Sequence, residues 1–198
     1  QVFITRDGLS ILLSRPKKAV RVPTKQNTGV KSLRPISPDS VSITSYEIER
    51  IDIVLQDAII KPEEIQTIEN INSPLFYLYF GTNSANNPAL RLKKQILVKN
   101  VYPGIDWRLV IKEDAGKPPV MKYDFIVRPG ADPSKIKIRY SNNCVVELTG
   151  EEITAKSRMG IIKEEKPYSY LQENGQAVDV RFQTKKNRIQ FQVDHYDK

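Results

Sequence analysis

The sequence predicts an all-β fold, an antiparallel β-sandwich-like module with many short strands and at most one or two short helices. Apolar and polar residues alternate in short runs along much of the 198-residue chain, which is typical of half-buried antiparallel strands. Turn signals separate these runs, most clearly Asp7-Gly8 and Asn174-Gly175, which favour hairpins. Because neither an internal repeat nor a clear linker is visible, residues 1–198 are expected to form a single module.

In the N-terminal half, the runs "VFIT" and "LSILL" flank Asp7-Gly8 and predict a hairpin. Residues 14–45 are rich in Pro, Ser, Thr and Lys and lack periodicity, so they predict a long basic loop. The run "YEIERIDIVLQDA" predicts a strand, with a helix as the alternative, and the aromatic-rich "SPLFYLYFG" predicts another strand. A short helix is expected only at residues 61–70.

A hairpin is predicted on either side of "EDAGKPP", because two runs there alternate cleanly. One run places apolar residues on one face and polar residues on the other: Ile105, Trp107, Leu109 and Ile111 against Asp106, Arg108 and Lys112. The second run repeats the apolar face with Met121, Tyr123, Phe125 and Val127. If Ile111 lies opposite Met121, then Trp107 faces Phe125 and Arg108 faces Asp124, and the aromatic residues are buried together.

Short strands are expected to continue to the C-terminal end of the sequence. They are "KIKIRY", "CVVEL", "EEITAK", "GIIKEE", "PYSYLQ", "QAVDVRFQ" and "RIQFQV". The last of these places Ile189, Phe191 and Val193 on one face.

The composition excludes several classes of protein. Hydrophobic residues make up 39% and charged residues 27%, as in soluble globular domains, and no apolar run reaches the ~18 residues of a membrane span. The single cysteine, Cys144, excludes an internal disulfide and a cysteine-rich zinc site, and with His195 as the one histidine a Cys–His nucleophile is disfavoured. No phosphate-binding glycine loop or metal-spaced histidine cluster occurs, so neither a cofactor nor a metal is predicted.

The net charge of +8 arises mainly from the segment between Arg15 and Arg34, which contains no acidic residue. Such a segment could contact an acidic polysaccharide, lipid headgroups or nucleic acid, or it could be a solvated loop. It lacks interleaved aromatic residues for base stacking, so nucleic acid is an unlikely partner. Because it also lacks apolar residues, we expect it to be mobile or held by surface contacts only.

Three aspartates are candidates for chemistry. Asp106 with Asp124 or Asp132 could supply the acid and base of a glycoside hydrolase, or all three could converge on calcium. The structural alternative is favoured. The turn "YPG" sets the direction of the strand that follows it, and Asp106 is expected to accept hydrogen bonds from backbone N–H groups or a basic neighbour. Asp124 is expected to pair with Arg108, and Asp132 to cap its own turn.

Four tyrosines are weak candidates for ligand binding. Their rings could form a platform for stacking sugars, or they could line the core with the hydroxyl groups at its edge: Tyr77, Tyr79, Tyr168 and Tyr170.

Two motifs in the middle of the chain resemble a known module. The first is "VYPGID", with Tyr102, Pro103, Gly104 and Asp106, and the second is "YDFIVRPGADP", with Tyr123, Asp124, Pro129, Gly130 and Asp132. Together they resemble the uncharacterised N-terminal module of bacterial secreted and cell-surface proteins that carry β-propeller-type (SBBP) repeats. The runs "VFITRDGLSILL", "YLYFG", "KPYSY" and "FQVDHYD" extend the resemblance, whereas Leu78, Leu171 and Trp107 depart from its usual residues.

The resemblance implies an extracellular or cell-envelope location, and a chain that is a partial or trimmed module of a longer protein. It implies no catalytic residues. We therefore expect a non-catalytic binding or scaffold module of an exported bacterial cell-surface protein, with a polysaccharide or another surface protein as partner. The alternatives are a carbohydrate-active enzyme that uses paired carboxylates and, with less support, a nucleic-acid binder.

Overall fold

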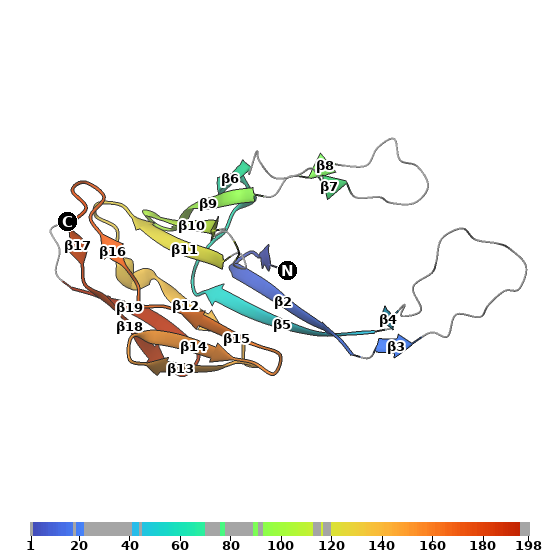
Figure 1. Cartoon of the computed structure of the whole chain (residues 1–198). Helices are drawn as coiled ribbons and strands as arrows, with labels where there is room; N and C mark the ends of the chain where they lie inside the picture. The colour runs from blue at the N-terminus through green and yellow to red at the C-terminus, as the bar shows by residue number, and fades with distance from the viewer. Residues whose placement is uncertain are drawn as a thin grey trace, which may run out of the picture.

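The fold is all-β and antiparallel, as predicted. The computed structural model describes residues 2–17, 19–21, 41–43, 45–69, 76–77, 89–90, 93–112, 116 and 120–194. The helical structure within these residues consists of short 3-10 turns, at Pro62–Glu64 and Pro133–Lys135. No helix in these residues is long and apolar enough to cross a membrane. Strands therefore make up the body of the molecule (Figure 1).

One layer is a six-stranded antiparallel sheet. Its strands, in spatial order, are β1 (Val2–Ile4), β2 (Gly8–Pro16), β5 (Tyr46–Leu55), β12 (Lys137–Tyr140), β19 (Arg188–Val193) and β18 (Val180–Lys185). β12 lies at the centre and pairs with β5 on one side and β19 on the other. The sheet thus joins the two ends of the described sequence through its middle strand.

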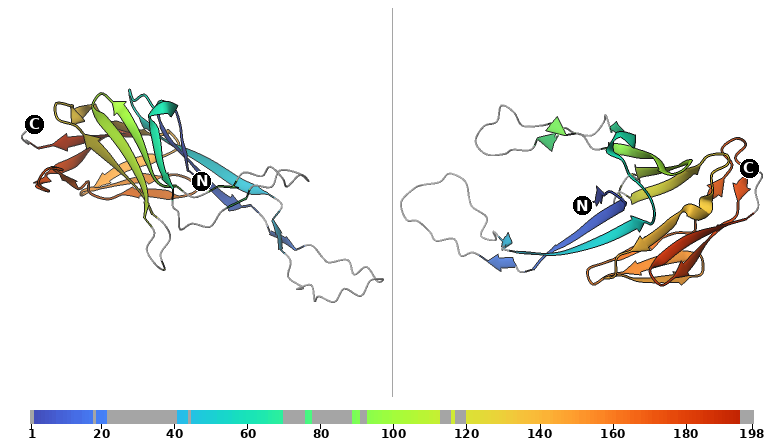
Figure 2. Two further views of the ribbon diagram at one scale, coloured as in Figure 1. Left: turned by 90° about the horizontal axis from the view of Figure 1, so that it is seen from above. Right: turned by 180° about the vertical axis from the view of Figure 1, so that it is seen from behind.

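Two smaller sheets pack against the inner face of this layer (Figures 1 and 2). The four-stranded sheet contains β11 (Val120–Val127), β10 (Ile105–Lys112), β9 (Lys93–Tyr102) and β6 (Ile65–Glu69). The three-stranded sheet contains β13 (Val145–Thr149), β14 (Glu152–Lys156) and β15 (Ile161–Glu164). Three further strand pairs are β3 (Ala19–Arg21) with β4 (Val41–Ile43), β7 (Phe76–Tyr77) with β8 (Ala89–Leu90), and β16 (Ser169–Tyr170) with β17 (Ala177–Val178).

The core lies between these layers and follows from the alternation of the strands. Inward-facing residues of every second position are buried: Leu9, Ile51, Ile53, Leu55, Ile105, Trp107, Leu109, Ile138, Tyr140, Ile153, Ala155, Phe182 and Ile189. Aromatic contacts link the layers, since the ring of Phe125 on β11 lies 6.1 Å from that of Phe191 on β19. Apolar burial of this kind is the main term that stabilises a sandwich.

A buried acid also ties the layers together. Glu49 on β5 accepts hydrogen bonds from the Ser157 hydroxyl at 3.0 Å and the Met159 backbone N–H at 2.7 Å, both in the turn between β14 and β15. The amide of Asn143 donates to the same carboxylate at 3.3 Å. Because these donors satisfy the carboxylate, its burial is tolerated.

The predicted register of the β10–β11 hairpin is confirmed. Trp107 pairs with Phe125, Arg108 with Asp124, and Ile111 with Met121. The predicted shared burial is only partly correct: Trp107 is 2% exposed, but Tyr123 and Phe125 are half-buried and Ile111 is exposed. β11 is the edge strand of its sheet, which leaves its side chains less covered than those of β10.

The structure corrects the loop predicted in the N-terminal half of the chain. The predicted loop at residues 14–45 is too long, because β2 continues to Pro16, which pairs with Tyr46, and β3 and β4 pair within it. Proline is tolerated at this point because β2 has a paired neighbour on only one side there. Arg15 is held at 2.8 Å by Glu47. Residues 22–40, which carry most of the predicted basic loop, lie outside the described residues.

The helix alternative for residues 46–55 is wrong, and the short helix expected at residues 61–70 is present only as one 3-10 turn. Residues 46–55 form β5, and the helix expected at residues 61–70 is replaced by the turn at Pro62–Glu64 followed by β6. β6 contains the β-branched residues Ile65, Thr67 and Ile68, and it pairs with β9. Of the strand predicted in "SPLFYLYFG", Phe76–Tyr77 are strand and the rest lies outside the described residues.

The Asp7-Gly8 hairpin is confirmed, and packing explains the glycine. β1 pairs with β2, and the Thr5 N–H donates to the Gly8 carbonyl at 2.9 Å. A Cβ atom at Gly8 would lie 2.0 Å from the backbone oxygen of Ile53 on β5. Only glycine therefore lets the hairpin lie this close to the neighbouring strand.

Candidate functional site

The two motifs found in the sequence contact each other. Gly104, between β9 and β10, has a positive φ of 73°, and a Cβ atom there would lie 2.9 Å from Cβ of Ala131. Its carbonyl accepts a hydrogen bond from the Arg128 backbone N–H at 3.0 Å. "VYPGID" and "RPGADP" are thus two sides of one packed unit, which explains why they occur together.

Asp106 lies at the centre of this unit and is 7% exposed. Nη2 of Arg128 donates to both of its carboxylate oxygens at 2.7 Å. The backbone N–H of Asn100 donates to Oδ1 at 2.8 Å, and the side chain of Asn100 accepts from Nη1 of Arg128 at 2.9 Å. Both kinds of donor expected for Asp106 are present, and they fix the carboxylate in place.

The other two candidate aspartates have separate roles. Arg108 donates to Asp124 across the β10–β11 hairpin at 2.5 and 2.9 Å, as predicted. Asp132 caps the turn at Pro133–Lys135 by accepting from the Ser134 N–H at 3.0 Å. Within the described ranges, no group of three His, Cys, Asp or Glu side chains is placed to hold a metal ion.

Other residues of the two motifs also have structural roles, through hydrogen bonds that involve the backbone. The hydroxyl of Tyr102 donates to the Lys137 carbonyl at 3.4 Å, and burial raises the pKa of Tyr102 to about 12. Gly130 has a φ of 79° in the turn after Pro129, where the Ala131 N–H donates to the Arg128 carbonyl at 3.0 Å. Tyr102 therefore joins the motif unit to β12.

The candidate tyrosines divide into two groups. Tyr168 and Tyr170, at β16, are 78% and 52% exposed, and their ring centroids lie 5.7 Å apart with an interplanar angle of 37°. Tyr77 belongs to β7, and its side chain and all of Tyr79 lie outside the described residues. The structure thus brings one pair of the four candidates together, on the surface.

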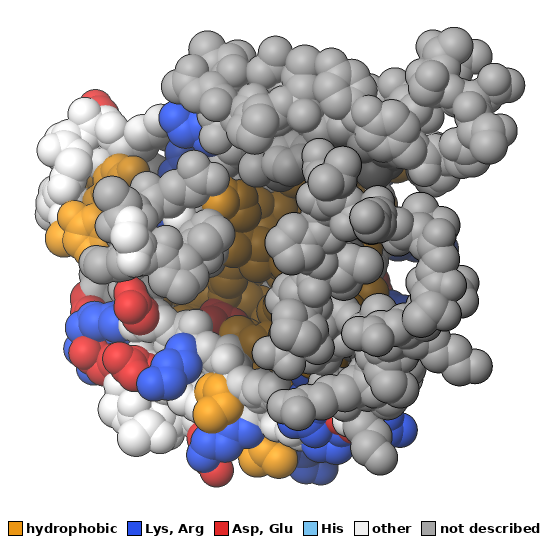
Figure 3. All heavy atoms as spheres, turned by 45° about the vertical axis from the view of Figure 1, so that its right-hand side comes forward, with side chains coloured by type: hydrophobic (Ala, Val, Ile, Leu, Met, Phe, Trp, Pro, Cys, Tyr) orange, Lys and Arg blue, Asp and Glu red, His pale blue; other side chains and the backbone are white. Residues whose placement is uncertain are grey.

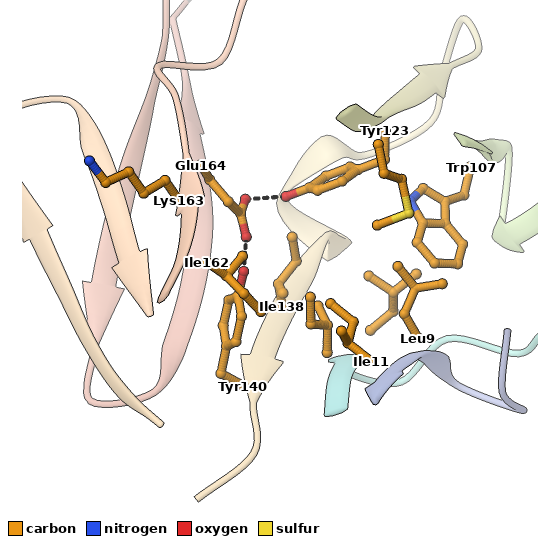
Figure 4. A pocket seen from close by; sticks show the side chains of 12 residues that line it. Leu9, Ile11, Trp107, Tyr123, Ile138, Tyr140, Ile162, Lys163 and Glu164 are labelled. Atoms are coloured by element: carbon orange, nitrogen blue, oxygen red, sulfur yellow. Dashed lines mark hydrogen bonds between the residues drawn. The ribbon is translucent and has the colours of Figure 1, made fainter. Parts of the chain in front are cut away.

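A cavity of about 80 Å³ lies between the layers. Its lining is mostly apolar: Leu9, Ile11, Ile53, Leu55, Trp107, Met121, Tyr123, Ile138, Tyr140, Ile162, Lys163 and Glu164. Figure 3 shows hydrophobic side chains gathered in a hollow on one side of the molecule, in keeping with this lining. Figure 4 shows the amino group of Lys163 directed away from the cavity and the carboxylate of Glu164 directed into it.

Glu164 is the polar centre of the cavity. Its carboxylate accepts hydrogen bonds from the hydroxyls of Tyr123 on β11 and Tyr140 on β12, so it joins all three larger sheets (Figure 4). Burial raises the pKa of Glu164, although the two tyrosine hydrogen bonds oppose the shift. Burial also raises the pKa of both tyrosines. A buried carboxyl with a raised pKa can bind or release a proton, and its oxygens can accept a hydrogen bond from a polar group.

Trp107 contributes a second polar group. Its indole Nε1–H is buried without a hydrogen-bond partner among the described residues. Sequence reasoning did not identify this cavity. One signal existed in "GIIKEE", where alternation places Glu164 on the same side of the strand as Ile162.

The fold and these contacts define an all-β module whose sequence motifs build a packed structural unit and whose buried carboxyl joins its sheets. The chain belongs to the family described as "Domain of unknown function (DUF7948)", which matches residues 1–198. This supports the prediction of an uncharacterised module. Comparisons with curated proteins and with solved structures find no match.

Proposed function

We propose that this chain is a non-catalytic binding module of an exported bacterial cell-surface protein, and that it binds polysaccharide through Tyr168 and Tyr170. The adjacent, exposed rings of these two tyrosines carry the proposal. Tyr170 lies on β16 and Tyr168 directly precedes the strand, and the 5.7 Å between their ring centroids places the two rings side by side. Such a pair presents apolar ring faces together with hydroxyl groups, which suits the mixed apolar and hydroxylated surface of a sugar.

The hairpin that carries the pair has its own hydrogen bonds. Ser169 pairs with Val178 and Tyr170 with Ala177, and the Leu171 N–H donates to the Gln176 carbonyl at 2.8 Å. A platform whose backbone is already ordered loses less conformational entropy when it binds a ligand.

A non-catalytic role is supported by the contacts of the candidate carboxylates. Asp106 is engaged by Arg128, and Asp124 by Arg108, while Asp132 caps a turn. Each of these carboxylates is therefore engaged by a partner within the protein, in contacts that hold strands and turns together. The resemblance of the two motifs to modules of secreted proteins supports an extracellular or cell-envelope location.

The test is a glycan array probed with the wild-type chain and with Tyr168→Ala and Tyr170→Ala. Each substitution is expected to weaken binding about tenfold, as when an aromatic residue is truncated at the centre of an interface. Tyr46→Ala is the matched control, since Tyr46 is 58% exposed on β5, outside the β16–β17 hairpin. Equal binding by all four proteins would contradict the proposal. Release of reducing sugar by the wild type would favour the enzyme alternative.

A further inference from the structure

The outer face of the six-stranded sheet carries a row of cations across three adjacent strands. Arg139 on β12 pairs directly with Arg188 on β19, which in turn pairs with Lys185 on β18. Directly paired residues of an antiparallel sheet project from the same face. Their neighbours Ile138 and Ile189 are buried in the core, so this row points outward.

Lys137 adds a fourth cation, because it stands two residues before Arg139 on the same face of β12. We call Lys137, Arg139, Lys185 and Arg188 the basic face. β12, β19 and β18 lie side by side in Figure 1. Neighbouring strands are about 5 Å apart, so the four charges lie within one compact area.

These charges are not neutralised by acids among the described residues. The ion pairs there do not include any member of the basic face. Acids on this side of the sheet lie beside other bases: Asp52 binds Arg50 and Ser10, Asp179 binds Arg181, and Asp194 lies near Arg181. Like charges directly opposite each other destabilise a strand pair, so the arrangement lowers the stability of the free protein.

A row of amides lies beside the row of cations. Lys137 pairs with Gln190, and Gln190 pairs with Gln183, whose amide donates to Gln192 at 2.8 Å. Amide groups donate hydrogen bonds to hydroxyl groups and also accept them. Arginine binds carboxylate and sulfate groups through two parallel hydrogen bonds. The face therefore combines donors for anionic groups with partners for sugar hydroxyls.

We propose that the basic face binds an anionic polysaccharide through its carboxylate or sulfate groups. The strand spacing of about 5 Å is close to the length of one sugar residue, so successive cations can meet successive charged sugars. Nucleic acid fits less well, because the outward positions of β12, β18 and β19 contain no aromatic residue on which a base could stack. The inference rests on polysaccharide binding as the proposed function, but uses residues other than Tyr168 and Tyr170.

The experiment measures binding of the full chain to polygalacturonate, as a carboxylated probe, and to heparin, as a sulfated one. Neutral dextran and double-stranded DNA serve as comparison probes. The double variant Arg139→Gln/Arg188→Gln is expected to lose about tenfold or more in affinity and to show a weaker salt dependence, because two cation contacts are removed. Removing the repulsion between these two arginines should keep or raise the melting temperature, so unfolding would not explain the loss.

The matched control is Arg15→Gln/Arg158→Gln, which removes the same charge from residues that pair with Glu47. It is expected to bind the preferred anionic probe nearly as wild type does. Three results would overturn the inference: no binding to either anionic probe, an equal loss in the control, or tighter binding to DNA than to both polysaccharides. If Tyr168→Ala and Tyr170→Ala lose binding to dextran or to the glycan array but still bind the anionic probes, the tyrosine pair and the basic face are two separate sites.

Discussion

Replacing Trp107 by alanine is expected to lower the free energy of unfolding by about 3–5 kcal/mol. Trp107 is almost fully buried, and its ring stacks on Phe125 with a centroid distance of 6.5 Å and an interplanar angle of 15°. A buried aromatic side chain removes about 150–250 Å² from water, which at about 25 cal/mol per Å² gives about 4–6 kcal/mol. Loss of the unpartnered Nε1–H offsets this cost by about 1–3 kcal/mol, whereas the cavity left by the ring adds to it, so the net cost stays at about 3–5 kcal/mol.

Trp107→Phe is the informative second variant. It keeps most of the ring packing and removes the unpartnered N–H, so its cost is expected to be about 0–2 kcal/mol. Urea denaturation and thermal unfolding, both followed by circular dichroism, measure the free energy of unfolding and the Tm of both variants. For a chain of this length, 1 kcal/mol corresponds to about 2–4 °C in Tm. An unchanged Tm for Trp107→Ala would refute the buried position, and equal losses for both variants would show that Nε1–H has a partner.

Three further predictions concern other positions. Burial raises the folded-state pKa of Glu164 above its ordinary value of 4.5, so its stabilising contribution is complete below that value and is lost as pH rises through the folded pKa. As pH rises above 4.5 the wild type should therefore lose stability relative to Glu164→Gln, whose side chain does not titrate, and parallel pH profiles of the two proteins in urea denaturation would contradict this. Asp106→Asn should lower stability by about 1–3 kcal/mol through the lost Arg128 pair and leave glycan binding intact; full stability with lost binding would make Asp106 a functional residue. Gly8→Ala should cost about 1–3 kcal/mol or more because its Cβ meets the Ile53 backbone, whereas Gly160→Ala, which meets only a methyl of Leu13, should cost less in the same melting assay.

The sequence was sufficient where structure is local. Alternation gave the faces of β10 and β11, and the hairpin constraint then gave the register that pairs Arg108 with Asp124. The sequence was insufficient where pairing with a strand distant in the sequence determines the secondary structure. Ile65–Glu69 have a helix-compatible sequence in isolation, but β9 offers them a ladder of backbone hydrogen bonds. No local pattern contains that information.

The candidate site shows the same division. The contacts of Asp106 could be anticipated because its donors come from nearby turns and a neighbouring strand. The bonds of Glu164 could not, because Tyr123 and Tyr140 reach it from two other sheets. The basic face likewise depends on the pairing of Arg139 with Arg188, which are neighbours only after β12 and β19 have met.

The position of β12 also has a consequence for the order in which the protein is made and assembled. β5 ends at Leu55, β12 spans Lys137–Tyr140 and β19 begins at Arg188, so the two neighbours of β12 emerge from the ribosome long before and well after it. Until β12 arrives, β5 presents an unpaired edge to other chains, which is a site for aggregation. Contacts between such distant segments also make folding slow. In a nascent chain, β12 therefore has to pair with β5 first and with β19 later. The six-stranded sheet is complete only once β19, its last strand in the sequence, has been synthesised.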